Sequence, residues 1–391
     1  MLDFDCSLEV FGRQFLRDYT FVLYFWKMNI KEITNYLESI APLAYQESYD
    51  NSGLIVGDAN AEVNAALITI DCTEEVVDEA IESNCNLIIA HHPIIFSGLK
   101  KITGQNYVER TIIKAIKNDI AIYAIHTNLD NVSTGVSAKI AEILGVENCK
   151  ILSPKKDLLR QLVVYCPTSD AENMKSVLFS SGAGDIGNYD ECSFTSKGEG
   201  TFRANEDCNP HLGKIGDRHK EKEERIEVIF PKNRENSIIS AMKKAHPYEE
   251  VAYQIYILDN IYENVGAGII GDLPEEMDTN QFLETIKNKM QPDCIRHSNL
   301  VKNQIKRVAI CGGSGSFLLS KAICAKADIF ITADFKYHEF FDAENDIIIA
   351  DIGHFESEQF TKDLIYDLLS KKFSKFAVRL SKVHTNPINY L

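Results

Sequence analysis

Residues 86–93 read Asn-Leu-Ile-Ile-Ala-His-His-Pro, a continuous apolar run that ends at two adjacent histidines and a proline. The run is apolar at successive positions rather than at alternate ones, which is typical of a strand buried on both faces of a sheet. A similar run, residues 120–125, ends at His126, while residues 65–71 end at an aspartate and lead into an acidic helix start at residues 73–80. Apolar strands that alternate with helical segments predict an α/β fold with a largely parallel sheet.

The same pattern returns in the C-terminal part of the chain, while the middle differs. Strand-like residues, a proline and a helix-like stretch follow one another in residues 162–178 and again in residues 226–242. This duplication predicts a ferredoxin-like α+β module inserted into the main domain, with coincidence of two short patterns as the alternative. The stretch 181–221, rich in Gly, Asp, Asn and Lys, is expected to be its loop region. The C-terminal apolar runs, each followed by a helical segment, are residues 307–311, 327–332 and 346–351.

We therefore divide the chain into a split main α/β domain, an inserted domain and a short N-terminal lead. A capped amphipathic helix is predicted to begin at Met28, so the preceding residues are either disordered or the product of an upstream start. A real N-terminal element that packs on the body is the alternative. The predicted parts are residues 1–27 as an N-terminal extension, 28–157 as the first half of the main domain, 158–258 as the inserted domain and 259–391 as the second half.

The charge and the cysteine content restrict the class of protein. The 391 residues include 41 Lys and Arg and 57 Asp and Glu, a net charge of −16, which argues against general binding to nucleic-acid phosphates. Ten cysteines are scattered without one Cys-x-x-Cys, which excludes a zinc ribbon and favours a reducing compartment. The apolar run at residues 21–26 is too short to span a membrane. We expect a cytoplasmic protein that does not bind membranes, and binding to nucleic acids is disfavoured rather than excluded.

Imidazole and carboxylate side chains follow several of the predicted strands. Ligands in open α/β sheets bind beyond the carboxyl ends of the strands, so these side chains are expected to converge. His354 and Glu358 are four residues apart and share one face if a helix starts near residue 354. A single histidine at a strand end is more often hydrogen-bonded or exposed than a ligand, but the whole set favours a metal site. The expected ligands are His91, His92, Asp130, His354 and Glu358.

Five nitrogen and oxygen donors exceed what one catalytic ion with an open position requires. Two divalent ions, bridged by a carboxylate and a water, account for the number better. Because no thiolate is among the donors, zinc, iron or manganese is the expected metal. His126 and His338 lie close to the same predicted edge and are candidates to move protons.

A glycine-rich turn follows the apolar run at residues 307–311. It contains Gly312, Gly313, Ser314 and Gly315 and precedes a helical stretch, so its backbone N–H groups are candidates to bind a phosphate. It is not a Walker A loop, because no Gly-Lys-Ser/Thr follows. A plain tight turn is the alternative.

Five motifs together resemble one known family. They are His91-His-Pro93 after an apolar strand, His126-Thr-Asn-Leu-Asp130, Cys311-Gly-Gly-Ser-Gly315, Thr332-Ala-Asp-Phe-Lys-Tyr-His338 and Gly353-His-Phe-Glu-Ser-Glu358. In this order they are similar to the GTP cyclohydrolase 1 type 2 homolog family, also called the Nif-three-like proteins. The resemblance runs from Met28 to the C-terminus. The insert resembles the extra domain of the longer members, including residues 198–202 and 246–250.

The resemblance implies a dinuclear metal site in the main domain and a toroidal homohexamer whose sites face an internal cavity. Matched by motif, the five residues named above would be the ligands, and Glu358 would bridge the two ions. His126 would be a further ligand or a proton carrier. The family name implies opening of the GTP ring with release of formate.

Our leading hypothesis is a metal-dependent hydrolase. Its expected substrate is a small molecule, and a nucleotide is one candidate. Hydrolysis of phosphoesters or nucleotides is a second interpretation, because paired ions suit in-line displacement equally well. A non-enzymatic regulator that binds metal or nucleotide and engages a partner through the insert is a third. The net charge excludes generic DNA binding but not a phosphate-bearing substrate.

Overall fold

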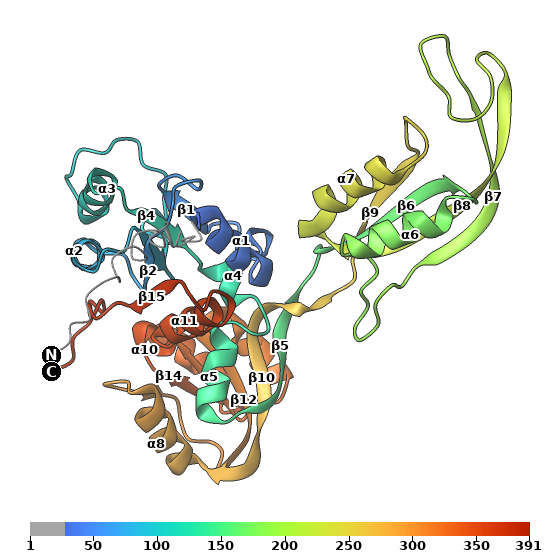
Figure 1. Ribbon diagram of the computed structural model, residues 1–391. Coiled ribbons are helices and arrows are strands. Elements are labelled where there is room, and N and C mark those ends of the chain that lie inside the picture. Colours follow the sequence, from blue (N-terminus) through green and yellow to red (C-terminus); the bar gives the residue numbers. More distant parts are fainter. Residues whose placement is uncertain (1–27) are drawn as a thin grey trace, which may run out of the picture.

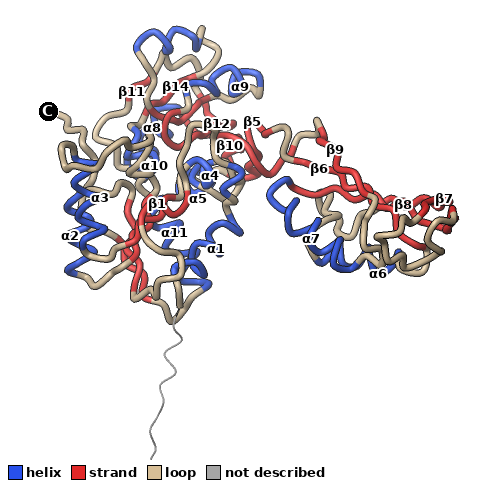
Figure 2. The backbone as a smooth tube through the Cα atoms, turned by 90° about the horizontal axis from the view of Figure 1, so that it is seen from above, coloured by secondary structure: helices blue, strands red, loops and turns tan. Residues whose placement is uncertain are grey.

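The computed structural model describes residues 28–391 (Figure 1), so the predictions for residues 1–27 lie outside the described chain. The described chain is a mixed α/β structure with three sheets. Two of the sheets form a body, and the third belongs to an insert that projects from it (Figures 1 and 2). No helix within residues 28–391 is both long and apolar enough to cross a membrane.

The first sheet has five strands in the order β1-β4-β3-β2-β15. Strands β15, β2, β3 and β4 run parallel, and β1 is an antiparallel edge. Helices α2 and α3 pack on one face and α1 and α11 on the other, which explains why the central strands are apolar at successive positions. The bounds are α1 Ile30–Ile40, β1 Gly53–Val56, β2 Ala65–Thr69, α2 Glu74–Glu82, β3 Leu87–Ala90, α3 Tyr107–Lys117, β4 Ala121–Ala124, α11 Thr361–Lys372 and β15 Ala377–Leu380.

The second sheet has six strands in the order β11-β14-β13-β12-β10-β5. Only β12, β13 and β14 are parallel, and the flanking strands are antiparallel. One core joins the two sheets, because side chains of both pack with α1, α5, α8 and α11. The bounds are α5 Val136–Leu144, β5 Glu147–Lys155, β10 Tyr262–Asp278, α8 Thr279–Met290, β11 Arg296–His297, β12 Gln304–Ser314, α9 Leu319–Cys324, β13 Ile329–Ala333 and β14 Ile348–Asp351.

The prediction of one largely parallel sheet is therefore wrong in two respects. The body holds two sheets, and in the second of them antiparallel pairs outnumber parallel ones. Local apolar patterns reveal buried strands, but they do not reveal which strands share a sheet. Strand β10 is the clearest example. It pairs with β5, although the whole insert lies between these two strands in the sequence.

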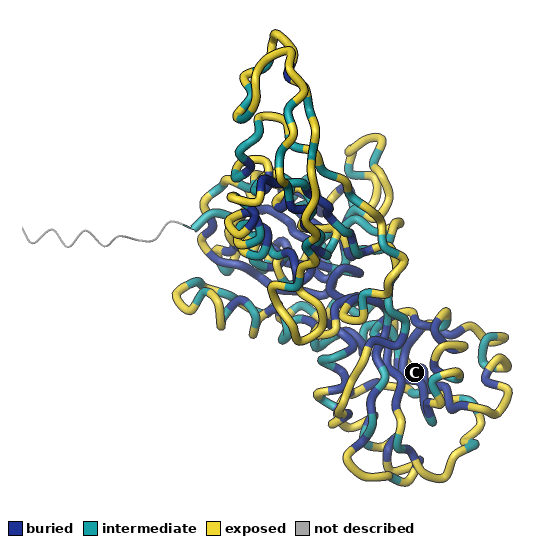
Figure 3. Tube along the Cα trace, turned by 90° about the vertical axis from the view of Figure 1, so that its right-hand side faces the viewer, coloured by how far each residue is buried: buried dark blue, intermediate teal, exposed yellow. Residues whose placement is uncertain are grey.

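The insert is a four-stranded antiparallel sheet in the order β7-β8-β6-β9 with two helices and its own apolar core. Its elements follow the order β-α-β-β-α-β of the ferredoxin-like arrangement. Residues 194–203 form strand β7, although this stretch was expected to be loop; between Phe194 and Phe202 its side chains are small or polar and carry no apolar signal. The loop beyond it is exposed (Figure 3). The bounds are β6 Leu159–Pro167, α6 Ala171–Ser180, β7 Phe194–Arg203, β8 Arg218–Pro231, α7 Glu235–Ala245 and β9 Tyr253–Leu258.

Short helices lie where the parallel strands end and position the candidate site. Helix α4 follows β4, and α10 follows β14, so each begins at the carboxyl end of a buried strand. Gly353 precedes α10 with a φ of 92°, a left-handed conformation that glycine adopts without strain. The bounds are η1 Leu43–Tyr45, α4 Thr127–Asp130, η2 Lys232–Arg234, η3 Ser316–Leu318, η4 Tyr337–Ala343 and α10 His354–Glu358.

Candidate metal centre

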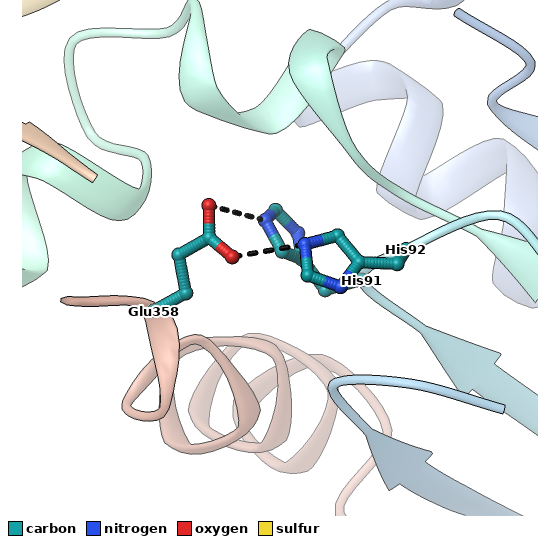
Figure 4. A group of neighbouring side chains, drawn as sticks. All are labelled: His91, His92 and Glu358. Carbon is teal, nitrogen blue, oxygen red and sulfur yellow. Dashed lines mark ion pairs between the residues drawn. The ribbon is translucent and has the colours of Figure 1, made fainter. Parts of the chain in front are cut away.

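The two histidines after β3 meet a glutamate from the opposite sheet. His91, His92 and Glu358 offer donor atoms that all lie within 4.8 Å of one another. Nε2 of His91 is 3.7 Å from Oε1 of Glu358, and Nε2 of His92 is 2.9 Å from Oε2. Both rings face the carboxylate, one toward each oxygen (Figure 4). The glutamate therefore spans two imidazoles that lie side by side.

His354 joins the same carboxylate from its own helix. The helix predicted near residue 354 is α10, and its i, i+4 spacing puts His354 and Glu358 on one face. Nε2 of His354 lies 3.2 Å from Oε2 of Glu358 and 3.4 Å from Nε2 of His92. Asp130 approaches from the other side, with Oδ1 3.6 Å from Nε2 of His91. The structure thus brings together all five predicted ligands.

Three of these separations have the size expected between two ligands of one metal ion, while Nε2 of His92 and Oε2 of Glu358, 2.9 Å apart, are at hydrogen-bond distance. Two donors each about 2.1 Å from a tetrahedral ion lie roughly 3.4 Å apart. The distances of 3.2–3.7 Å around His91, His354 and Asp130 are of this size. Nε2 of His91 and Oδ1 of Asp130 are buried without a hydrogen-bond partner, a costly state that a cation would relieve.

Nδ1 of each histidine that is a candidate ligand has an oxygen partner. Nδ1 of His91 lies 2.8 Å from the Ile125 carbonyl oxygen, and Nδ1 of His92 lies 2.8 Å from Oδ1 of Asp71. Nδ1 of His354 lies 2.6 Å from Oδ2 of Asp334. Oxygen acceptors at Nδ1 place the hydrogen there and leave the Nε2 lone pair for a metal, as in the usual histidine sites of metalloproteins.

Charges in the cluster are strongly coupled. Burial is the largest single influence and favours neutral imidazoles, but Glu358 together with Asp71 raises the pKa of His92 to about 10, and Glu358 together with Asp334 raises that of His354 to about 11. Burial also opposes ionisation of Glu358, yet these two histidines hold its pKa well below the usual range. Burial and the nearby Glu358 raise the pKa of Asp130 to about 7. The buried carboxylates therefore need positive charge beside them, which protons or divalent ions can supply.

His126 stands beside the cluster and is held by an aspartate. Its ring centre lies 5.4 Å from that of His91 and 5.3 Å from that of His92. Its Nδ1 is 2.7 Å from Oδ1 of Asp50, whose other oxygen accepts from Thr127. Burial opposes ionisation of Asp50, but these hydrogen bonds lower its pKa. The Asp50–His126 pair has the arrangement of an oriented acid–base group.

The glycine turn is used for packing rather than as an open phosphate site. Backbone N–H of Gly313 donates to Ser357 Oγ at 2.9 Å, and that of Gly312 donates to Ser137 Oγ at 3.3 Å. A Cβ on Gly313, whose φ is 63°, would lie 2.2 Å from Oε1 of Glu358. Two of the four residues predicted to bind phosphate thus have occupied N–H groups, and Gly313 lets the chain approach the Glu358 carboxylate.

His338 is not brought into the cluster. It lies exposed in η4, where its ring stacks 6.4 Å from Phe341 and contacts Tyr337. His338 was predicted to lie beside the strand ends because it is near Asp334 in the sequence. Strand β13 ends before His338, however, and His338 belongs to η4. Within one chain, His126 is therefore the better candidate to move a proton.

Three aspartates are hydrogen-bond partners of the histidines, and reasoning from the sequence did not predict this role for them. Asp71 follows β2, so the strand-end rule that selected the ligands also applies to it. Asp334 follows β13 in the same way. Asp50 lies in the loop before β1, where the residues Tyr49-Asp-Asn-Ser-Gly-Leu54 gave no signal of a partner in α4.

A cavity of about 450 Å³ opens over the centre. His92, His126, Asp130, His354 and Glu358 line it together with the exposed aromatic side chains of Tyr49, Phe96 and Phe317. Within the described part of the chain no lysine or arginine lines it. A small molecule fits this volume, and positive charge for an anionic one would have to come from bound cations.

Comparisons with known proteins agree with the motifs. The profile of the family Duf34/NIF3 (NGG1p interacting factor 3) matches residues 28–387. Relatives from Bacillus subtilis (36% identical over 370 residues) and Halalkalibacterium halodurans (38% over 368 residues) are each called "GTP cyclohydrolase 1 type 2 homolog"; each match covers 93% of this chain and 99% of the relative.

Two solved structures are similar over the same length. A Bacillus cereus protein related to NIF3 is 38% identical with a TM-score of 0.80, and a Staphylococcus aureus protein is 30% identical with a TM-score of 0.74. Each match covers 93% of this chain and 99% of the other. The family resemblance predicted from the motifs is confirmed.

Proposed function

The chain belongs to the Duf34/NIF3 family, and on that premise we propose that it is a hydrolase whose water is activated by two divalent ions. The observation that carries this proposal is the placement of the Glu358 carboxylate. Oε1 faces His91, which in turn faces Asp130, and Oε2 faces His92 and His354. Two donor sets joined by one carboxylate suit a pair of bridged ions better than a single ion.

The chain's own residues supply the rest of the chemistry. Zinc, iron or manganese, when bound, would lower the pKa of a coordinated water. His126 lines the cavity with Nδ1 tied to Asp50, so its Nε2 is free to accept or donate a proton there. Tyr49, Phe96 and Phe317 offer apolar surface at the cavity mouth.

The name of the relatives suggests GTP as the substrate. Ring opening of GTP releases formate, whereas hydrolysis of its phosphates, the second candidate, releases phosphate. The second candidate is supported by the two donor sets, because paired ions stabilise both the attacking and the leaving oxygen of an in-line displacement. The acidic lining makes either reaction depend on the bound ions to hold a triphosphate.

The first test is metal content followed by product analysis. We expect about two equivalents of metal per chain after reconstitution, and formate from GTP in proportion to enzyme. Release of phosphate without formate would reject the ring-opening hypothesis and support phosphoester hydrolysis. Metal binding without either product, over GTP and generic phosphoesters, would reject the hydrolase and favour a metal-binding regulator.

We also propose that the chain assembles as a homohexamer, as the family resemblance implies. Exposed aromatic side chains are consistent with burial between copies: Tyr337 and Phe341 are 74% and 66% exposed, with ring centres 5.7 Å apart. Native mass spectrometry should give a mass of six chains. A monomer at micromolar concentration would reject this proposal.

A further inference from the structure

The insert joins the body through two adjacent segments, residues 152–158 and 262–266, which we call the stem. The stem lies next to the candidate metal centre. The first strand of the insert follows β5, which ends at Lys155, and its last strand leads into β10, which starts at Tyr262. Lys155 and Tyr262 face each other in the register of these two strands. The rest of the insert projects away from the body (Figures 1 and 2).

Lys155 clamps a loop of the body that reaches the cavity. Its Nζ lies 2.7 Å from Oε1 of Glu47 and donates to the carbonyl oxygen of Tyr45 at 2.8 Å. Glu47 itself lines the cavity above the metal ligands. The pair is only partly exposed, with 22% of the Lys155 side chain and 35% of the Glu47 side chain accessible, so solvent weakens it less than a fully exposed pair.

The same loop holds the residue that follows a predicted metal ligand. Nδ2 of Asn131 donates to Oε1 of Glu47 at 3.0 Å and to the Tyr45 carbonyl at 2.9 Å. Asn131 is buried and comes directly after Asp130. Lys155 and Asn131 thus share both acceptors, and the clamp fixes the turn that presents Asp130.

The second strand of the stem grips this turn as well. The backbone N–H of Gly266 in β10 donates to the Asn131 carbonyl at 2.8 Å, and Val132 forms a bridge to Val265. Tyr262 packs edge-on against Tyr45 with ring centres 6.4 Å apart. Strand β10 therefore contacts the turn after Asp130 directly, and β5 reaches it through Glu47 and Tyr45.

A further branch leads from the loop to His126. The backbone N–H of Glu47 donates to Oγ1 of Thr127 at 2.9 Å, and this hydroxyl donates to Oδ2 of Asp50 at 2.5 Å. Asp50 orients the His126 ring. A shift of Glu47 would move the partners of His126 as well as the turn at Asp130.

We propose that the stem of the insert positions Asp130 and that Lys155 is the positioning residue that couples the insert to the metal centre. A ligand or partner that reorients the insert would then change how tightly the centre holds metal. The proposal rests on the metal centre of the proposed function but not on the reaction, because it concerns ligand geometry alone. Coupling of this kind is reciprocal, so metal binding must also change the stem.

The test uses Co²⁺ alone as the probe in the full-length protein. Lys155→Met removes the charge and keeps the length of the side chain, and we expect its Co²⁺ affinity to fall about threefold to tenfold, less than the roughly 10- to 100-fold typical when a direct partner of a ligand is lost. The visible spectrum of bound Co²⁺ should shift, because the field at the ion changes. Lys155→Arg should restore both.

Lys156→Met is the matched control. Lys156 is the next residue of the stem and pairs with Asp259 at 3.4 Å, and both of these side chains are mostly exposed. The Lys156→Met variant loses the same charge as Lys155→Met but leaves the contacts of Glu47 intact. It should bind Co²⁺ like the wild type. Equal Co²⁺ affinity and spectra for Lys155→Met and wild type would overturn the proposal.

Hydrogen exchange of the wild-type protein tests the coupling without any variant. Adding Co²⁺ should increase protection of the stem, residues 152–158 and 262–266, more than that of strand β8 in the insert. Unchanged exchange in the stem would overturn the proposal even if Lys155→Met failed to fold. Because neither measurement uses turnover, loss of the hydrolase hypothesis would leave both results readable.

Discussion

The metal centre and the turn around His246 in the insert use buried histidines in opposite ways. His246 is held at both nitrogens: Nε2 lies 2.8 Å from the Tyr165 carbonyl, and Nδ1 accepts from the Tyr248 N–H at 3.1 Å. His91 is equally buried, but its Nδ1 alone has a hydrogen-bond partner, and its Nε2 has none. The second nitrogen therefore separates a histidine that fixes a turn from one whose Nε2 can bind a further partner.

The environment of His246 also differs from that of His92, the neighbour of His91 in the candidate metal centre. Burial is the main influence on His246 and lowers its pKa, which suits a neutral ring that bridges a carbonyl and an N–H. Burial is also the largest single influence on His92, but the carboxylates of Glu358 and Asp71 together outweigh it and raise the pKa of His92 to about 10. Both ring nitrogens of His246 are satisfied by the backbone, whereas the ring of His92 lies between two carboxylates that favour positive charge there.

The largest effect is expected from Glu358→Gln. The amide has a similar shape but one oxygen and no charge, so it cannot bridge two donor sets. Metal affinity should fall by more than about a hundredfold, beyond the loss seen for partners of ligands. Elemental analysis after dialysis measures it.

Glu356→Gln is the control for this variant. Glu356 is buried on the same helix, and its Oε1 accepts from Asn386 at 3.1 Å instead of facing the cluster. It should retain metal. If Glu358→Gln kept two equivalents, the carboxylate would not be the bridge.

The convergence of the five candidate ligands was predictable because it depends on local pattern. An apolar run shows a buried strand, and the residue after it lies at the sheet edge where ligands collect. His91, His92 and Asp130 come from one sheet and His354 and Glu358 from the other, yet the rule placed all five without knowing this. The partition into two sheets was not predictable, because strand pairing over long separations leaves no mark in a single run.

A second prediction concerns pH and the metal-free centre. The pKa values of His92 and His354, about 10 and about 11, exceed the unfolded value of about 6.5. Their protonation thus stabilises the metal-free protein fully below about pH 6.5 and is lost as pH rises through about 10 to 11. Metal must displace these protons, so its affinity should rise roughly tenfold per pH unit for each proton released.

Melting temperatures with a chelator and with excess Co²⁺, between about pH 6 and pH 9, check this sign. The stabilisation by metal should grow with pH over the whole interval. A difference in melting temperature that stays constant would mean that the imidazoles are neutral before metal binds.

A smaller effect is expected from Asp71→Asn, which weakens the support of one ligand. Oδ1 of Asp71 faces Nδ1 of His92 and Oδ2 accepts from Thr385 at 2.7 Å, so the aspartate fixes the ring and its tautomer. Co²⁺ affinity should fall about 10- to 100-fold while the stoichiometry is kept. Titration with Co²⁺ measures both.

Asp78→Asn removes a carboxylate of the same body that pairs with Lys114 at the surface, and it should bind Co²⁺ normally. An Asp71→Asn protein with wild-type affinity would show that the Ala90–His92 backbone alone orients the ring. This partner was open to prediction from its place after β2, whereas Asp50 was not, since its contact with Thr127 depends on how the loop folds across α4.

The smallest effect on metal is expected from His246→Ala, which tests the other side of the comparison. The change removes both hydrogen bonds of the ring and leaves the Tyr165 carbonyl without its partner, so the insert should lose about 1–3 kcal/mol of stability. Metal content should stay at the wild-type level, because the His246 turn lies near the end of β6 that is away from the stem. Hydrogen exchange should show faster opening of α7 and β9 only, and the exposed His297 replaced by Ala should show neither effect. Loss of metal in His246→Ala would mean that disorder in the insert reaches the centre, and then the two histidine environments would not be independent.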